Sequence, residues 1–576
     1  MILNLLHRPG EGPFELQQEI AHSFNLKVTL MLRAKDLFDQ ATLDTAIKHH
    51  QQYGDEIGLW FMAFDCPEFD RVIGGQEEFI WLRSKEDKQR IFDFLMGRFY
   101  ELFGRYPTAV GAYHMDCESL NLLKAAYPGV KITVAGCFEE GVKVFHGCNN
   151  SWYLFNEGMP WQPWYPSQNH SLRPAESVED AIDIVAVPHL SRDLVLSYEG
   201  RNDFWASHSG NVQRGLGNEG SLCPYNFNLV DQYRLQEKYN DGYSYYHVFC
   251  SAGWLQGNPN IQDPDEVSQT LYREKLEYFA RLRNEGKLID MHMSEYADWH
   301  RKNIPVGKPA ITISKEILYG SRKHYHWYID PYFRVLIDCN QGGSIGDLRP
   351  YAGKVAVSTG PDSPHLVYGS YPYIIHSQYR TGNSTHAYSG SRTTLLLNNG
   401  EETIDLCTCR TRNESICDNG KGKEVNLTAA VVKFKNGDTV TVSTSFVFAG
   451  NGSIIIKRRY SEVRGKISVC ELFKGCAGIT EYPVDLHGVK LYFSKTPEEQ
   501  IDYAYRSRQL EQKNPAGLVA EIPQVNTIVR WSGYNTAWQK GEVSEGFLFN
   551  PYFSLELKKQ ITANEESAVC LKIEKI

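Results

Sequence analysis

The sequence has no stretch that approaches the roughly 20 apolar residues that a membrane-spanning helix needs. It also has no long run of Lys or Arg, and its net charge is -9. Both absences argue against nucleic acid and against an anionic membrane as the main partner. We therefore expect a protein that acts with neither of them.

Cysteine is sparse for a chain of this length. There are 13 cysteines, an odd number, and no pair has the C-x-x-C spacing. This pattern indicates free thiols in a reducing compartment. The apolar run Ile2–Leu6 is too short for a secretory signal and has no basic region before it. We expect a cytoplasmic protein, and a signal peptide removed earlier would make it periplasmic instead.

Several signatures of well-known enzyme classes are missing. The chain has no phosphate-binding P-loop, and the G-x-S-x-G pattern at Gly342–Gly346 lies in a turn-rich β segment by context. A NodB-type deacetylase would show an Asp-Asp pair on its first strand and a His-x-x-x-His after a later strand. Here the first strand ends in His7-Arg8-Pro9, and Trp60 stands on the third. We therefore expect no cofactor, although a divalent metal stays open.

The 576 residues exceed what one hydrophobic core organises, so at least two domains are expected. In the first part, short apolar runs alternate with helical patterns, which favours parallel β/α units and a barrel. The predicted strands are Ile2–Leu6, Lys27–Leu32, Ile57–Phe61, Ala109–Tyr113, Lys131–Ala135, Ile182–Val187, Tyr243–Cys250 and Leu288–Met293. The predicted helices are Asp36–Tyr53, Ser84–Phe103, Cys117–Ala126 and Glu266–Glu285.

The pattern changes near Arg301–Pro309. Short β-branched runs separated by Gly, Asn and Asp follow, which is typical of a β-sandwich. Only Pro497–Gln512 looks helical in this part. The sequence therefore predicts an α/β chain with an irregular seven-stranded β/α barrel over residues 1–305 and a β-sandwich over residues 306–576.

Polar residues follow the predicted strands of the barrel. Parallel strands bring their carboxyl ends together, and chemistry in barrels sits at that end. The candidates in chain order are His7, Asp65, Asp116, Glu118, Glu139, Glu140, His189, Arg192, Asp193, His292, Glu295 and Asp298. Six of them have a structural alternative: Asp116 and Glu118 could serve the following helix dipole, His189 and Glu295 could be structural, and Glu139 and Glu140 could be solvated.

Aromatic residues make up 12% of the chain, and many stand beside amides in two loop-like stretches. The stretch 145–174 contains Trp161 and Trp164, and the stretch 198–215 contains Arg201, Asp203 and His208. Sugar rings stack on aromatic faces, and their hydroxyls need planar polar partners. These stretches are therefore predicted to bind a saccharide, with packing in a buried loop as the alternative.

Longer motifs resemble known families. "LLHRPGEG" is similar to the His-Gln-Pro opening of glycoside hydrolase family 57, with Arg8 in place of the glutamine. "GAYHMDCES" resembles the segment that carries the nucleophile in family 57 and in the family 38 α-mannosidases, and Asp116 aligns with that position. Family 57 places its acid after the last strand, where Glu295 and Asp298 fall. The first-strand Asp that helps to hold zinc in family 38 is missing.

The run "WYPSQNHSLRPA…AIDIVAVPHLSRD" resembles a family of gut-bacterial proteins provisionally described as glycoside hydrolase/deacetylases, over most of residues 1–305. The second half resembles the supersandwich β-domains that follow the barrels of families 38 and 57. The resemblance implies the irregular barrel of this superfamily and an activity on carbohydrate.

The leading hypothesis is a glycosidase acting on a small, α-linked glycoside with two carboxylates. Asp116 is the predicted nucleophile or base and Glu295 the acid, with Asp203 as the alternative acid. The residues predicted to hold or orient the sugar are His7, Asp65, Trp161, Trp164, His189, Arg192, Asp193, Arg201 and His208. A metal-dependent carbohydrate deacetylase and a non-catalytic carbohydrate-binding protein are the rival hypotheses, and assembly into a homo-oligomer stays open.

Overall fold

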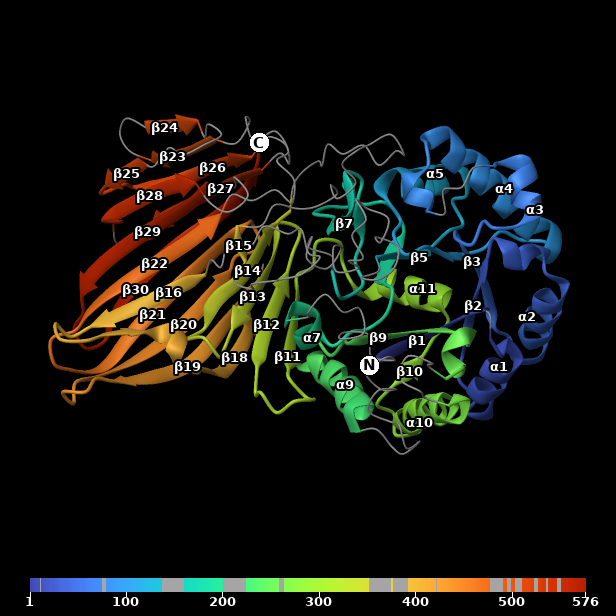
Figure 1. Cartoon of the computed structure of the whole chain (residues 1–576), viewed down its shortest axis with the longest axis horizontal. Coiled ribbons are helices and arrows are strands. Elements are labelled where there is room, and N and C mark those ends of the chain that lie inside the picture. The colour runs from blue at the N-terminus through green and yellow to red at the C-terminus, as the bar shows by residue number, and fades with distance from the viewer. Residues whose placement is uncertain are drawn as a thin grey trace. The chain divides into compact units, whose positions relative to one another are not determined.

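The computed structural model divides the chain into two compact units (Figure 1). The first unit is Met1–Lys308 with Ile317–Gly320 and Val357–Leu366, and the second is Pro309–Glu316, Ser321–Ala356 and Val367–Ile576. The structure describes residues 1–10, 12–74, 79–136, 160–199, 224–257, 264–351, 374–376, 392–420, 422–476, 490–494, 499–502, 510–522, 527–534, 537–545 and 551–576.

The first unit is built around parallel strands in the order β9-β1-β2-β3-β4-β5-β8, with the short β10 paired to the start of β1. Their bounds are β1 (Ile2–Arg8), β2 (Thr29–Arg33), β3 (Glu56–Trp60), β4 (Ala109–Gly111), β5 (Ile132–Gly136), β8 (Val185–Pro188), β9 (Tyr245–Ser251) and β10 (Ile289–Asp290). The Ser191 amide donates to the His247 carbonyl at 2.9 Å, so the segment after β8 meets β9. The strands therefore form a nearly closed barrel.

Helices follow most of the strands (Figure 1). Their bounds are α1 (Phe14–Ser23), α2 (Gln40–Tyr53), α3 (Pro67–Val72), α4 (Lys85–Phe103), α5 (Cys117–Ala126), α7 (Leu194–Glu199), α9 (Pro224–Arg234), α10 (Asp265–Asn284) and α11 (Met293–Asn303). Ser84 begins α4 by accepting from the Asp87 amide at 3.1 Å, and Gly54 ends α2 with φ 78°. A two-stranded ribbon, β6 (Pro166–Ser167) and β7 (His170–Pro174), lies outside the barrel sheet.

Helix α11 packs against the amino ends of the barrel strands. The Met293 amide donates to the Thr29 hydroxyl at 3.0 Å, and Thr29 is the first residue of β2. The Ser294 amide donates to the carboxylate of Glu56, the first residue of β3, at 3.1 Å. The start of this helix therefore lies opposite to the end at which the strands finish.

The second unit contains three antiparallel sheets (Figure 1). The first has β11 (Ala310–Lys315), β12 (His324–Ile329), β13 (Phe333–Asp338), β14 (Ser344–Pro350) and β15 (Ile375–His376). The second has β17 (Thr403–Asp405), β16 (Thr393–Asn398), β22 (Ser468–Cys476), β29 (Pro551–Gln560), β28 (Lys540–Glu545) and β25 (Leu510–Lys513). The third has β18 (Arg412–Asp418), β19 (Lys423–Lys433), β20 (Thr439–Phe448), β21 (Ser453–Arg464), β30 (Glu565–Lys575), β27 (Thr527–Gly533), β26 (Gly517–Ile522), β23 (Lys490–Ser494) and β24 (Glu499–Asp502).

The second and third sheets share a core, as a sandwich does. Leu395 and Val469 of the second sheet belong to one buried cluster with Val442 of the third. The rings of Trp531 and Phe553 also meet across the two sheets, with centroids 4.4 Å apart. The structure therefore has the predicted parallel barrel followed by an antiparallel β unit.

The predicted helix at Pro497–Gln512 is wrong where the structure describes it. Residues Glu499–Asp502 form β24, which pairs with β23, and Leu510–Lys513 form β25. The segment is rich in Glu, Gln and Arg, which favour helices, but its pairing with neighbouring strands overrides that weak preference. Within the described ranges, no helix is both long and apolar enough to cross a membrane.

Candidate functional site

Five side chains meet inside the barrel at the carboxyl ends of its strands, and we call them the Arg8 cluster. Its members are Arg8, Trp60, Tyr113, His189 and Phe249, which lie on or just after β1, β3, β4, β8 and β9. The Trp60 ring lies 5.7 Å from Tyr113 and 5.5 Å from Phe249, and the Tyr113 ring lies 5.3 Å from His189. Five separate segments of the chain therefore converge where barrel chemistry is expected.

The guanidinium of Arg8 is surrounded by aromatic rings. It lies 5.1 Å from the ring centre of Phe249, 5.7 Å from that of Tyr113 and 6.0 Å from that of Trp60. Its Nη1 donates a hydrogen bond of 3.0 Å to the Tyr113 hydroxyl. The aromatic faces attract the cation, so they hold the guanidinium without neutralising its charge.

The Arg8 side chain buries its Nε without a hydrogen-bond partner among the described residues, and the Trp60 indole buries its Nε1 in the same way. No acidic side chain of the described part forms an ion pair with Arg8, although the arginine is only partly exposed. A guanidinium keeps its charge in proteins, and a buried charge without a partner is unfavourable. The cluster can therefore accept a ligand that carries a negative charge.

His7 precedes Arg8 but faces the opposite way. Its Nδ1 lies 3.0 Å from the Gln18 amide oxygen, and its Nε2 contacts the Tyr272 hydroxyl. Gln18 belongs to α1 and Tyr272 to α10, so the imidazole lies under the outer helices. Burial lowers the pKa of His7 to about 3. The prediction that His7 orients the substrate is therefore wrong. Successive side chains of a strand point to opposite faces, and on β1 it is Arg8 that faces the inside of the barrel.

Asp116 begins helix α5. Its carboxylate accepts from the Ser119 amide at 3.0 Å, from the Ser119 hydroxyl at 2.6 Å and from the Lys88 ammonium at 3.1 Å. Lys88 is fully buried and also binds Glu118 at 3.0 Å. These contacts are those of a residue that caps a helix, which was the alternative to a catalytic role for Asp116. Because Asp116 follows β4, it also lies at the carboxyl end of the barrel strands.

Glu295 lies at the other end of the barrel. It accepts from Lys27 at 2.9 Å and from the His292 amide at 2.9 Å, and it forms a capping box at the start of α11. With a rise of roughly 3.3 Å per residue, a five-residue strand separates its two ends by roughly 13 Å. Two carboxyl groups that cleave one glycosidic bond lie about 5 to 9.5 Å apart. The predicted pairing of Asp116 with Glu295 is therefore wrong.

Three other predicted residues follow strands but have local partners. The carboxylate of Asp193 accepts from the amides of Val195 and Leu196 at 3.0 Å each, which starts α7. The Arg192 amide donates to the Tyr233 hydroxyl at 3.1 Å, and the Arg192 side chain is buried. Asp65 is exposed and pairs with Lys35 at 3.1 Å.

The two described tryptophans of the aromatic stretch are buried. Trp161 is 2% exposed and Trp164 is 5% exposed. The indole of Trp164 donates to the Ser171 carbonyl at 2.8 Å, and its backbone pairs with Ala186 of β8. These contacts describe packing beside the barrel, and the stacking role of the two rings stays a prediction.

Other predicted residues lie outside the described residues. They are Asp203, Arg201 and His208, together with Glu139 and Glu140. Conversely, the sequence prediction did not include Arg8, Trp60, Tyr113 or Phe249 as substrate-binding residues. The available signal was an arginine or aromatic residue at or next to the end of four predicted strands.

Comparisons with known proteins found similar solved structures and one matching family model. The chain is similar to a Parabacteroides distasonis protein provisionally described as a glycoside hydrolase/deacetylase, with 13% identity, 63% of this chain and 87% of that chain covered, and a TM-score of 0.46. It is also similar to the 4-alpha-glucanotransferase of Thermococcus litoralis, with 11% identity, all of both chains covered and a TM-score of 0.31. The search of curated proteins found no match. Residues 17–303 match the family model described as "Domain of Unknown Function with solved-structure structure (DUF3863)".

Proposed function

We propose that this chain is a carbohydrate-active enzyme that acts at the carboxyl ends of its barrel strands on a saccharide bearing an anionic group. The observation that carries the proposal is the guanidinium of Arg8, which lies within the aromatic rings of Trp60, Tyr113 and Phe249 and forms no ion pair with an acidic residue of the described part. The planar fork of an arginine binds a carboxylate or a sulfate through two parallel hydrogen bonds.

The composition of this end of the barrel supports a sugar as the rest of the ligand. Aromatic rings offer apolar faces, and indole and imidazole nitrogens offer polar edges for hydroxyl groups. Trp60 contributes a buried indole N–H without a partner among the described residues, and Trp254 adds a half-buried ring 6.0 Å from Phe249. A uronic acid combines these requirements, because one pyranose ring carries both apolar faces and a carboxylate.

Hydrolysis of a glycosidic bond is the reaction we propose. One carboxyl group protonates the leaving oxygen, and a second attacks the anomeric carbon or activates water. Asp116 follows β4 and aligns with the nucleophile position of the families that the sequence resembles. Its carboxylate accepts three hydrogen bonds and can accept one more. Its partner must stand at the same end of the barrel, where the sequence predicts Glu139, Glu140 and Asp203.

The experiment is a hydrolysis panel in which each uronic acid glycoside is matched with the neutral glycoside of the same configuration. We expect wild type to cleave one of the acidic members faster than its neutral partner. Arg8→Met should lose most of that preference. Arg98→Met is the matched control, since Arg98 also lies over an aromatic ring, 5.3 Å from Phe38, but on α4. Equal rates of Arg8→Met and wild type on the acidic substrate would refute the proposal.

A carbohydrate-binding protein without turnover is the second candidate. The observation that favours it is that the described strand-end acids have partners: Asp116 binds Lys88, Asp193 caps α7, and Asp65 binds Lys35. This candidate predicts binding of the acidic saccharide with no product from any member of the panel. If wild type forms product and Asp116→Asn binds the saccharide but forms none, the chain is an enzyme.

A further inference from the structure

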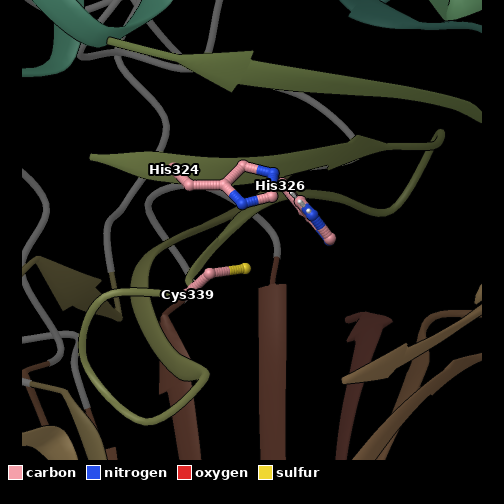
Figure 2. Close-up of side chains that lie close together, drawn as sticks. All are labelled: His324, His326 and Cys339. Carbon is pink, nitrogen blue, oxygen red and sulfur yellow. Dashed lines mark hydrogen bonds between the residues drawn. The ribbon is translucent and has the colours of Figure 1, made fainter. Parts of the chain in front are cut away.

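We propose that His324, His326 and Cys339 bind a Zn²⁺ ion in the second unit of the chain (Figure 2). One potential ligand atom from each of these side chains lies within 4.8 Å of the others. The three residues belong to the β unit and not to the barrel. The proposed metal site therefore belongs to a different unit from the proposed saccharide site.

Strand geometry brings the three side chains together. His324 and His326 are two residues apart on β12, so their side chains share one face of the sheet. The neighbouring strand β13 ends at Asp338, which pairs with Tyr325, and the next residue is Cys339. The Cys339 amide donates to the His324 carbonyl at 3.1 Å, which places the thiol beside the histidines.

The distance between the two imidazoles suits a tetrahedral ion. Their Nε2 atoms lie 3.2 Å apart, and the ring planes meet at 70°. With zinc–nitrogen bonds of about 2.0 to 2.1 Å, two nitrogens on a tetrahedral ion lie about 3.3 Å apart. Figure 2 shows the ring of His326 beside that of His324, with the sulfur of Cys339 on the adjoining segment. The arrangement needs only small side-chain rotations to converge on one ion.

A hydrogen bond between the two imidazoles is the alternative explanation of the short distance. It does not account for the Cys339 thiol, whose sulfur lies within 4.8 Å of a ring nitrogen of each histidine. His326 is fully buried and Cys339 is 1% exposed, whereas His324 is partly exposed. An ion can therefore reach the site from the side of His324.

The ligand set selects the kind of metal. Thiolate and imidazole favour zinc or copper(I), whereas Mg²⁺ and Ca²⁺ prefer oxygen ligands. The buried carboxyl group of Asp338 stands next to Cys339. On the other side, Lys315 of β11 lies opposite His324 in the register of the two strands. These opposite charges offset one another, so a site with one thiolate keeps a modest net charge. Three protein ligands leave a fourth position for water.

A second group of three residues does not offer the same geometry. The rings of His22 and His49 stack with centroids 5.3 Å apart and planes at 14°, and His22 is held by Asp55 at 2.9 Å. Stacked rings present their faces to each other, whereas a metal binds in the plane of each ring. The arrangement of His324, His326 and Cys339 therefore suits a metal ion better than this second group does.

The test loads the full chain with Zn²⁺, removes free ion by dialysis and measures bound zinc per chain. We expect close to one equivalent for wild type and at least a tenfold lower value for Cys339→Ala. Cys570→Ala is the matched control, since Cys570 is a partly buried free thiol on β30, and it should keep the wild-type value. Binding by Cys339→Ala equal to wild type, or no zinc on wild type, would overturn the proposal.

Cobalt substitution adds a readout for the thiolate ligand. Co²⁺ bound to sulfur gives an intense charge-transfer absorption, which we expect in wild type and in Cys570→Ala. We expect it to be absent from His324→Gln and Cys339→Ala, whose circular dichroism should stay native. A cobalt-loaded wild type without this absorption contradicts ligation by Cys339. Arg8→Met should bind zinc as wild type does, so failure of the saccharide proposal leaves this test intact.

Discussion

Arg8 and Tyr113 are joined by a hydrogen bond of 3.0 Å from the guanidinium Nη1 to the phenol oxygen. The bond connects the end of β1 to the segment after β4 and fixes one corner of the guanidinium. Nε of Arg8 has no hydrogen-bond partner among the described residues, so another part of the fork stays available. Tyr113 thus positions Arg8 rather than neutralising it.

This relationship predicts the effect of Tyr113→Phe. The variant keeps the ring beside the guanidinium but removes the acceptor, so Arg8 loses one restraint. Hydrogen bonds to charged groups contribute about 1.5–3 kcal/mol, and we expect affinity for an acidic saccharide to fall at least about 10-fold. Isothermal titration measures the change. Affinity for the matched neutral saccharide should stay nearly constant, and an equal loss for both ligands would contradict the positioning role.

Asp116 and Glu295 are predicted to respond differently to substitution. Asp116→Ala removes the cap of α5 and a partner of the buried Lys88, so the free energy of unfolding should fall by about 2–4 kcal/mol. Glu295→Gln alters a half-exposed contact with Lys27, so we expect a loss of about 1 kcal/mol or less. Urea denaturation measures both. Glu295→Gln should also keep wild-type turnover, and a large loss of turnover would restore it as the acid.

Three buried histidines predict how stability depends on pH. Burial lowers the pKa of His7 to about 3, of His247 to about 4 and of His300 to about 3. The unfolded chain protonates each of them near pH 6.5, so their stabilising contribution is present above that pH. It decreases as the pH falls toward the folded-state values.

Between pH 7.5 and pH 5.5, each of these histidines should remove about 1.4 kcal/mol from the free energy of unfolding. Urea titrations at the two pH values measure the loss. In His300→Phe the loss should be smaller by about that amount, because one titrating group is gone. A variant that loses as much stability as wild type over this interval would contradict the assignment of a neutral, buried His300.

A buried ion pair links the two sheets of the sandwich. Arg458 of β21 donates to Glu471 of β22 at 3.2 and 3.1 Å, and both side chains are at most 3% exposed. Arg458→Met should lower the free energy of unfolding by about 3–5 kcal/mol, because it leaves the carboxylate buried alone. Replacing both partners, with Glu471→Leu added, should recover much of the loss. No recovery in the double variant would show that the single change acts through packing.

The barrel elements could be predicted because their signals are local. Ser84 marks the start of α4, Gly54 marks the end of α2, and apolar periodicity fills the helix between Lys85 and Phe103. The direction of side chains on β1 could not be predicted in the same way. A strand buried on both faces is apolar throughout, so sequence alternation does not separate His7 from Arg8.

The position of Glu295 depends on topology rather than on local pattern. It follows a predicted strand, as Asp116 does, but β10 has only two residues and pairs with the first residues of β1. The chain therefore enters α11 at the amino ends of the strands. Similarly, "KHYHWY" shows two histidines in one strand, but only the register of β12 and β13 brings Cys339 beside them.

The most direct test of the central claim compares two ligands and two proteins. The ligands are a uronic acid saccharide and the neutral saccharide of the same configuration, and the proteins are wild type and Arg8→Met. For wild type we predict at least roughly 30-fold tighter binding of the acidic ligand, which corresponds to about 2 kcal/mol. For Arg8→Met we predict nearly equal affinities. The same preference in both proteins would contradict the assignment of Arg8 as the anion-binding residue.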